Sequence, residues 1–400
     1  MKKIVQFSML IAGVLMMASC GILPEPVDPS VEPIEEMDGT EENSNVDESS
    51  ESDISTVEVQ MDSEYYRPVI AEDGTYRTSQ HRGITRQLNS GINIRTFESD
   101  LMRLSQRYFP TDNHFLQEGQ FLSANDVNSW LSRREEPNAE DEGETETDEE
   151  ENLGLNPPAN GSDDPNDRVP NYLNSILEHN FYVQTDNGLE LAGLSIGLAL
   201  NQVDYYRAND TEYEQTISRE ELLEAGREMA NEVVARLRER EGLGNLPIMI
   251  ALYEQSTRDN LAPGTYIAEG LSENGSTSVD EWRAIDEDRL VFPLEGMQSA
   301  EGNSFANFRS EVEGFFPNIS GVTGIAHYAE EQLIHLQIDI MIQFYGKGEI
   351  IAFTQFLNEA GLNYLPGTVP IEIRVQSLNR MESFLYKEAN EDEFTVFIYN

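Results

Sequence analysis

The 400-residue chain contains one cysteine, Cys20, and only four lysines beside 22 arginines. A single cysteine excludes an internal disulfide framework and a zinc site built from several thiolates. Arginine stays charged at high pH, where lysine begins to lose its proton. The shortage of lysine therefore favours a surface exposed to alkaline or saline medium, with GC-rich codon usage as the alternative.

Positive charge is scarce throughout, with 26 basic against 74 acidic residues and a formal net charge of −48. Two runs contain no basic residue at all: 21–66 has 15 acidic residues and 135–167 has 14. Nucleic-acid binding requires a basic footprint, so the composition excludes a nucleic-acid partner. Charge repulsion and the absence of apolar periodicity predict a disordered tether over 20–62 and an acidic loop or linker over 135–167.

The N-terminal apolar run, Leu10 to Met17, is too short to span a bilayer, which takes about 20 apolar residues. Lys2 and Lys3 precede it, and the small residues Ala18 and Ser19 follow it. This order is typical of a cleaved signal peptide. We predict a signal peptide over 1–19, cut between Ser19 and Cys20.

The stretch "MASC" at 17–20 resembles the bacterial lipobox, in which a cysteine thiol receives diacylglycerol and becomes the mature N-terminus. Two acyl chains exceed the single chain that gives only marginal membrane binding. We predict that Cys20 is lipidated by lipoprotein-processing enzymes and anchors the protein on the extracytoplasmic face of the cell membrane. The alternative is an incidental free cysteine in an ordinary secretory signal.

The remaining sequence predicts an α+β fold of mixed or antiparallel sheets, with helices packed on one face. Residues 63–134 are predicted to form a small helical N-terminal unit, with helices over 98–109 and 123–133, the second capped by Ser123. Residues 168–400 are predicted to form an α+β domain with an internal β-α-β duplication, about 189–290 and 320–400.

Both copies read as a strand, a long helix, a Gly-Leu turn, Leu-Pro and a second strand. The first copy places them at 189–206, 218–241 and 242–255. The second copy places them at 330–345, 348–361 and 362–377, with a closing strand at 394–399. The strand 330–345 alternates strictly, which predicts a sheet exposed on one side. Its polar face holds Leu333, His335, Gln337, Asp339 and Met341, and its apolar face holds Ile334, Leu336, Ile338, Ile340 and Ile342.

No phosphate loop, Rossmann glycine pattern, HExxH or paired CxxC occurs, and we expect no cofactor and no metal. His327, Glu331 and His335 would share one strand face but spread over roughly 25 Å, too far for one ion. Ser195 in "GLSIG" matches G-x-S-x-G, yet lies in a strand-like run and not at a strand-to-helix elbow. We therefore expect no catalytic residue and no enzyme, with an envelope hydrolase as the least favoured alternative.

Nine arginines lie in 67–134, the one region without an acidic excess, and seven of them lie between positions 67 and 107. They could bind a phosphate-bearing wall polymer, phospholipid headgroups or an acidic partner. The alternative, which we favour, is that they pair with nearby carboxylates. The seven are Arg67, Arg77, Arg82, Arg86, Arg95, Arg103 and Arg107.

Several stretches together resemble the CamS family, lipoproteins whose precursors carry the cAM373-type sex pheromone in Gram-positive bacteria. They are "YYRPVI" (65–70), "RG" (82–83), "FESDLMRLSQRYFP" (97–110), "LQEGQFLSANDVNSWL" (116–131), "GLNPP" (154–158), "YLNSILEHNF" (172–181) and "LAGLSIGLALN" (191–201). The resemblance implies a lipoprotein on the outer face of the membrane, with no enzymatic role for the folded body.

The resemblance also implies that the cleaved signal peptide is trimmed to a short apolar peptide that induces conjugative plasmid transfer. Its terminal Ala-Ser matches the family, whereas its two methionines depart from it. A different interpretation is a body that binds an envelope ligand: a wall polymer, a peptide or a protein partner. The corresponding residues here are Gly13, Val14, Leu15, Met16, Met17, Ala18 and Ser19.

Overall fold

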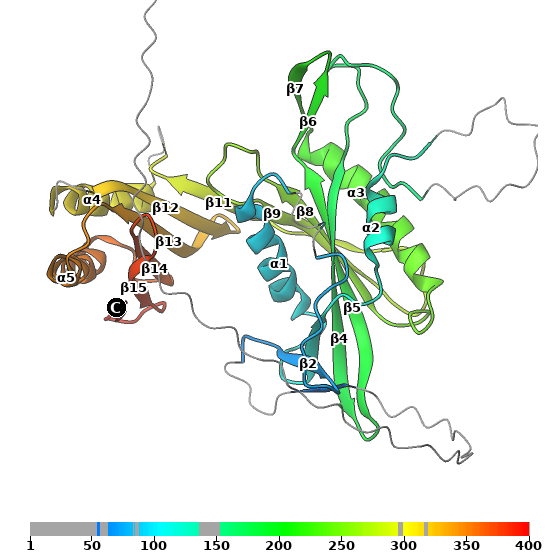
Figure 1. Ribbon diagram of the computed structural model, residues 1–400, viewed down its shortest axis with the longest axis horizontal. Coiled ribbons are helices and arrows are strands. Elements are labelled where there is room, and N and C mark those ends of the chain that lie inside the picture. Colours follow the sequence, from blue (N-terminus) through cyan, green and yellow to red (C-terminus); the bar gives the residue numbers. More distant parts are fainter. Residues whose placement is uncertain are drawn as a thin grey trace, which may run out of the picture. The chain divides into compact units, whose positions relative to one another are not determined.

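The protein is described by a computed structural model that covers residues 54–56, 63–82, 84, 88–135, 153–294, 299–315 and 319–399 (Figure 1). The predicted signal peptide, the lipidation site Cys20, the peptide 13–19 and Arg86 lie outside the described residues. Residues 136–152 of the predicted acidic linker also lie outside them. Among the described residues, no helix has the length and apolarity that crossing a membrane requires.

The described strands form three sheets. The eight-stranded sheet has the order β1 (Ile54–Thr56), β2 (Arg67–Ala71), β3 (His114–Glu118), β4 (Leu173–Thr185), β5 (Gly188–Asn201), β8 (Ile248–Gln255), β9 (Thr265–Ser272) and β10 (Trp282–Ala284). The six-stranded sheet has the order β11 (Glu287–Phe292), β12 (Ile319–Ala329), β13 (Gln332–Ile342), β14 (Ile371–Gln376), β15 (Met381–Lys387) and β16 (Thr395–Ile398). The third is a hairpin of β6 (Val203–Ala208) and β7 (Thr211–Thr216).

Five helices accompany these sheets in the described part of the chain. They are α1 (Gly91–Ser105), α2 (Ala124–Leu131), α3 (Arg219–Arg238), α4 (Ala300–Phe315) and α5 (Lys347–Tyr364). The predicted α+β class is confirmed. The segment 63–134 contains the two predicted helices, and it also supplies β2 and β3, so it shares one sheet with the strands that follow.

Side-chain caps explain where the helices start. Ser123 caps α2 in a reciprocal capping box with Asp126, as the sequence predicts. Ser218 caps α3 by a single bond, in which its side-chain hydroxyl accepts from the Glu221 backbone N–H. The predicted start of α1 was wrong by seven residues, because Ser90 accepts from the Asn93 N–H and begins the helix at Gly91. Phe109 follows the end of α1 and stacks on Phe181 at 4.4 Å.

Two other predicted boundaries were wrong. Helix α5 runs past Gly361 to Tyr364, so Gly361 does not end it. A Cβ on Gly361 would lie 2.9 Å from the Phe394 ring, which means that close packing selects this glycine. The strand predicted over 189–206 is two strands, because the chain leaves the large sheet at Gln202 to form the β6–β7 hairpin.

The predicted duplication is visible in the topology and is longer than the sequence indicates. The orders β3-α2-β4-β5-α3-β8-β9-β10 and β11-α4-β12-β13-α5-β14-β15-β16 are the same. Five successive strand pairs agree in direction, and only the third is parallel in each copy. The copies therefore span 114–284 and 287–398. Strand β11, assigned by the prediction to the first copy, pairs with β12 and belongs to the second.

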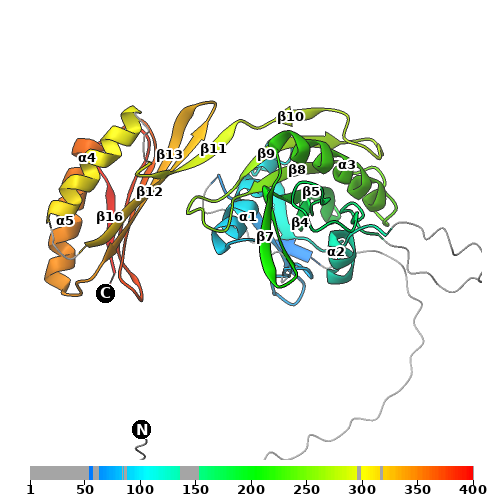
Figure 2. The ribbon, with the colours of Figure 1, turned by 90° about the horizontal axis from the view of Figure 1, so that it is seen from above.

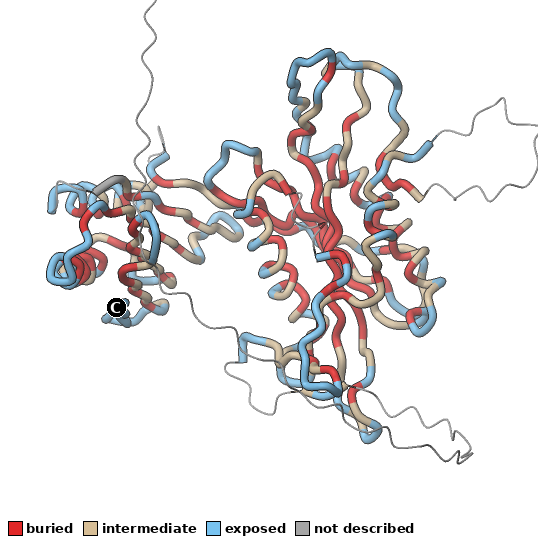
Figure 3. The backbone as a smooth tube through the Cα atoms, in the orientation of Figure 1, coloured by how far each residue is buried: buried red, intermediate tan, exposed pale blue. Residues whose placement is uncertain are grey.

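The two sheets are covered differently. Helices α4 and α5 lie on one face of the six-stranded sheet, as predicted, and no described helix of its own copy lies on the other face (Figure 2). In the eight-stranded sheet, α2 and α3 cover one face and α1 covers the other. Strand β5 is therefore buried on both sides, within the red centre of Figure 3.

The alternation along β5 and β13 reflects this coverage. In β5, Leu194, Ile196 and Leu198 pack toward α3, while the small residues between them meet α1. In β13, Leu336, Ile338, Ile340 and Ile342 are buried toward α4 and α5, as the alternation predicts. Ile334 is 38% exposed near the start of the strand, so the predicted apolar face is buried only from Leu336 onward.

Candidate functional site

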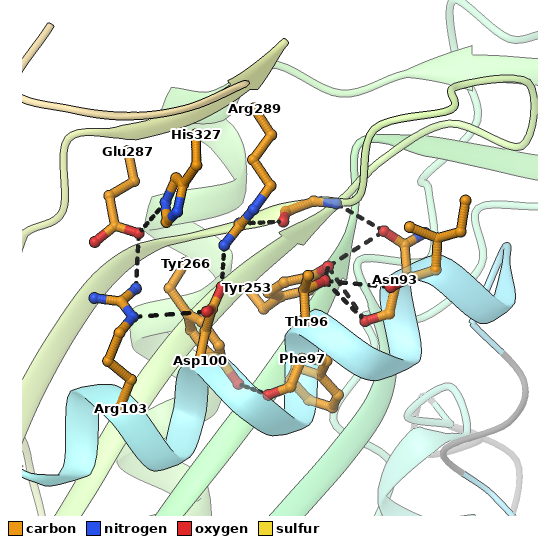
Figure 4. A network of polar contacts seen from close by, with 12 residues as sticks. Asn93, Thr96, Phe97, Asp100, Arg103, Tyr253, Tyr266, Glu287, Arg289 and His327 are labelled. Carbon is orange, nitrogen blue, oxygen red and sulfur yellow. Dashed lines mark hydrogen bonds and ion pairs between the residues drawn. The ribbon is translucent and has the colours of Figure 1, made fainter. Parts of the chain in front are cut away.

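Helix α1 is attached to β8 and β9 through buried hydrogen bonds (Figure 4). The Asn93 side-chain oxygen accepts from the Gly264 N–H at 2.8 Å and from the Ser256 N–H at 3.2 Å. The Tyr266 hydroxyl donates to the Phe97 carbonyl at 2.8 Å, and burial raises its pKa well above the usual value. A buried polar group without a partner is costly, so these bonds fix how α1 is placed on the sheet.

The next turn of α1 contacts the first strand of the second copy. Asp100 forms an ion pair with Arg289 of β11 at 2.7 Å between Oδ2 and Nη2, and both side chains are at least nine-tenths buried. Arg289 also donates to the Gly264 carbonyl at 2.9 Å. Both charges are desolvated, and such a pair is retained only when its partners satisfy each other.

Glu287, also on β11, joins Arg103 of α1 to His327 of β12 (Figure 4). Its Oε2 lies 2.7 Å from Arg103 Nη2 and 2.9 Å from His327 Nε2. Burial raises the pKa of Glu287, but the His327 hydrogen bond and the Arg103 charge outweigh burial and lower it to about 2. Burial lowers the pKa of His327, so its neutral ring donates to the carboxylate at neutral pH.

A cavity of about 700 Å³ lies beside this network. Its walls come from α1, from the loop between β8 and β9, and from the open face of β11 to β14. Ile92, Leu261, Pro263, Val291 and Ile325 give it an apolar wall. Polar and charged side chains line the remainder, and residues of both copies contribute to the walls. The charged lining residues are Arg95, Asp100, Arg289, Asp339 and Arg374, with His327 and His335 beside them.

Hydrogen-bonded polar side chains lie at the centre of the open face, the face of the six-stranded sheet opposite α4 and α5. Arg374 holds Asp339 with two parallel hydrogen bonds, Nε to Oδ1 at 2.7 Å and Nη2 to Oδ2 at 2.6 Å. Gln337 and Gln376 each donate a further hydrogen bond to the same carboxylate. The register places Phe384 beside Arg374 and Phe397 beside Phe384. The predicted polar face of this strand is therefore confirmed.

The two histidines considered for a metal lie close together, contrary to the prediction that they are spread along one strand. The chain turns at Glu330 and Glu331, both with positive φ, and His327 lies opposite His335 in the β12–β13 register. Glu331 is in that turn and not on the strand face. His335 Nε2 lies 3.5 Å from Glu372 Oε1, and that hydrogen bond lowers the Glu372 pKa. No three His, Cys, Asp or Glu side chains form a metal-binding group in the described ranges.

Ser195 is placed as the sequence predicts, within strand β5 and away from any elbow. It is fully buried, and its hydroxyl accepts a hydrogen bond from Ser105 at 2.7 Å. A nucleophilic serine must reach substrate, and this one contacts helix α1 instead.

The predicted arginine group is divided among several places. Arg82 pairs with Glu118 at 3.8 Å, and Arg107 with Glu269 at 3.9 Å. Arg67 stacks over the Phe115 ring at 4.3 Å, and Arg77 is exposed. Only two of the six described arginines reach the site: Arg103 in the Glu287 network and Arg95 in the cavity wall.

Sequence reasoning missed Asp100, Glu287 and Arg289. The two partners of the Asp100–Arg289 pair are 189 positions apart, and neither stands in a recognisable motif. The sequence showed no helical pattern before residue 98, so the first turn of α1, which carries Ile92, was not predicted. The Ser90 cap is the one local feature that could have revealed it.

Comparison with known proteins shows that the chain resembles sex pheromone precursors of bacteria. A family model described as "CamS sex pheromone cAM373 precursor" matches residues 76–393. The chain therefore belongs to the CamS family.

The solved structures that resemble it include two sex pheromone precursors. A sex pheromone precursor from Lactobacillus salivarius is 33% identical, with a TM-score of 0.78 over 87% of this chain and 99% of its own. The C-terminal domain of the sex pheromone staph-cAM373 precursor from Staphylococcus aureus is 30% identical, with a TM-score of 0.65 over 78% and 99%. No curated protein matches the sequence significantly.

Proposed function

We propose that the protein is a lipoprotein anchored through Cys20 to the extracytoplasmic face of the cell membrane, with a folded body that is not an enzyme. The observation that carries the proposal is the signal sequence ending in "MASC", in a chain of the CamS family. A diacylated N-terminal cysteine provides the two acyl chains that stable anchoring needs. The buried Ser195 hydroxyl and the ion-paired carboxylates beside the cavity support a binding or structural role for the body.

We further propose that the signal peptide is the precursor of an apolar, pheromone-like peptide, residues 13–19. The matched structures carry the name of sex pheromone precursors, and the Ala-Ser end before Cys20 agrees with the family. The peptide has no charged side chain, and cleavage after Ser19 gives it a free carboxylate. The released peptide would therefore be short and apolar, with a charged C-terminal carboxylate.

The anchor is tested by Cys20→Ser in cells, followed by fractionation and metabolic labelling with a fatty acid. We expect the variant to be unlabelled and released into the medium, whereas the parent stays in the membrane fraction. Arg77→Gln, an exposed change in the folded body, is the matched control and should stay labelled and anchored. Retention of the unlabelled serine variant in the membrane would reject the lipobox assignment.

The peptide is tested separately by mass spectrometry of the medium and by adding synthetic GVLMMAS to responder cells. Detection of the heptapeptide and induction of clumping or plasmid transfer are expected. If the protein is anchored to the membrane but releases no peptide, the proposed lipid anchor stands and the proposed precursor role is rejected.

An envelope ligand-binding body is the second candidate function. The cavity beside α1 favours it, because it combines apolar and charged lining on a sheet face that no described helix of the second copy covers.

A further inference from the structure

One arginine that lines the cavity beside α1 forms no ion pair among the described residues. Arg289 is neutralised by Asp100, and Arg374 by Asp339, in short ion pairs. Arg95 also lines the cavity and is exposed; among the described residues it forms no ion pair, and its charge acts on the Glu372 carboxyl only over a longer distance. In a chain of net charge −48, an unpaired guanidinium in a cavity wall favours an anionic ligand group.

The wall next to Arg95 is apolar and open. Ile92 lies one helical turn before Arg95, so both side chains are on the same face of α1. Ile92 is 41% exposed, and Leu261, on the loop between β8 and β9, is 58% exposed. Both side chains are large and apolar. Pro263, Val291 and Ile325 continue this wall. Covering such surface contributes favourable free energy to binding.

Hydrogen-bonding groups complete the lining. The hydroxyls of Ser99 and Thr323 face no side-chain hydrogen-bond partner within the described part of the chain. Gln337 uses its amide nitrogen for Asp339, which leaves its carbonyl oxygen as an acceptor. These groups match the N–H and C=O groups of a peptide backbone, which lose their water when they enter a cavity.

One class of molecule presents all three features, namely a short apolar peptide with a free C-terminal carboxylate. We propose that this cavity binds such a peptide, with the carboxylate on Arg95 and the apolar side chains on the wall formed by Ile92 and Leu261. The chain itself encodes a candidate: residues 13–19, GVLMMAS, have no charged side chain and end in a carboxylate after cleavage. The identity of this ligand rests on the proposed cleavage after Ser19.

The folded body would then bind the peptide that is cut from its own precursor and would hold a fraction of it at the membrane surface. An Arg–carboxylate contact at a cavity mouth gives the binding both orientation and dependence on a free C-terminus.

The test measures fluorescence anisotropy of N-terminally labelled GVLMMAS with the full mature chain carrying Cys20→Ser. The same peptide with an amidated C-terminus is the matched ligand control. We expect the acid to bind at least tenfold more tightly than the amide, and Arg95→Gln to abolish that difference by weakening the acid alone. Arg77→Gln removes an exposed arginine that does not line the cavity, and it should leave the difference unchanged.

Equal binding of acid and amide, or an Arg95→Gln variant that still prefers the acid, would overturn the proposal. The thermal melt of Arg95→Gln should lie close to that of the parent, because Arg95 is exposed and forms no ion pair among the described residues. Displacement by dodecanoate at lower concentration than by unlabelled GVLMMAS would assign the site to fatty acids and reject the peptide. A scrambled apolar heptapeptide acid that binds equally would support recognition of the class without sequence preference.

Synthetic peptide is used throughout, so failure here is distinct from failure of the precursor role. Binding without peptide in the medium would reject only the cellular source. Peptide in the medium without binding would reject only the cavity.

Discussion

The two copies of the fold have the same strand order and directions, yet one buries both faces of its sheet and the other buries one. The difference lies in α1, which precedes the first copy in sequence and has no counterpart before the second. The first sheet accepts it with small residues: a Cβ on Gly197 of β5 would be 2.8 Å from the Tyr266 hydroxyl and 2.9 Å from the Phe97 ring. The corresponding strand of the second copy, β13, has Gln337 and Asp339 on its open face. Because α1 covers the first sheet, that sheet is buried on both faces. The open face of the second sheet lines the cavity instead.

Replacing Phe97 with alanine should have the largest effect on the covered face. Phe97 is fully buried between Tyr253 and Tyr266, with ring centroids at 5.1 and 5.9 Å. We expect the free energy of unfolding to fall by about 4 kcal/mol, the usual cost of such a cavity. Phe397→Ala on the open face, where the ring is 52% exposed, should cost less than about 1 kcal/mol in the same urea titration. Similar losses for both variants would contradict the difference in coverage.

The link between α1 and the second copy is tested by Arg289→Leu. Removing the guanidinium leaves Asp100 buried without its main partner, and we expect a loss of about 3 kcal/mol in chemical unfolding. Adding Asp100→Leu should recover most of that loss, because two apolar side chains replace the desolvated pair. A double variant as unstable as the single one would show that the ion pair does not account for the effect.

Acid should weaken the covered sheet through His179 of β4. Burial, with a smaller contribution from His81, lowers the pKa of His179 to about 4, and its Nδ1 has no hydrogen-bond partner. The folded state binds a proton less readily than the unfolded state, whose pKa is about 6.5. Stability is therefore fully present above pH 6.5 and falls by about 3 kcal/mol as pH decreases to 4.

The measurement is a series of urea titrations between pH 7 and pH 4, with His179→Leu as the control. The variant should lose the part of the pH dependence that His179 contributes. Glu287 joins the second copy to α1, and its lowered pKa removes further stability only below about pH 4.5, as pH falls toward 2. An unchanged slope in the leucine variant between pH 6.5 and 5 would exclude His179 as its source.

The smallest effects are expected from two substitutions on corresponding strands, one on β5 and one on β13. Gly197→Ala should reduce stability by about 2 kcal/mol, because the new methyl group enters a contact with Phe97 and Tyr266 that cannot open without moving α1. Gln337→Val on β13 should change stability by no more than about 0.5 kcal/mol. Thermal unfolding of both variants is sufficient, and an alanine at 197 without effect would show that α1 adjusts easily.

Much of the local structure could be predicted because its signals are local. Ser123 and Ser218 precede helices that they cap, and the strict alternation from Leu336 to Ile342 separates a buried face from an open one. The site was less predictable. His327 and His335 are brought opposite each other by a turn that the apolar pattern did not indicate. Asp100 finds Arg289 only through the packing of α1 beside β11.

The sequence alone determined the scarcity of positive charge, the α+β class and most helices and strands, since each depends on neighbouring residues, and it predicts the lipidation of Cys20. Only the tertiary structure decided the full length of the duplication, which sheet face stays open, and which of the arginines line the cavity. Those features depend on strand pairing and on desolvated contacts between segments far apart in the chain, and neither leaves a periodic signal in the sequence.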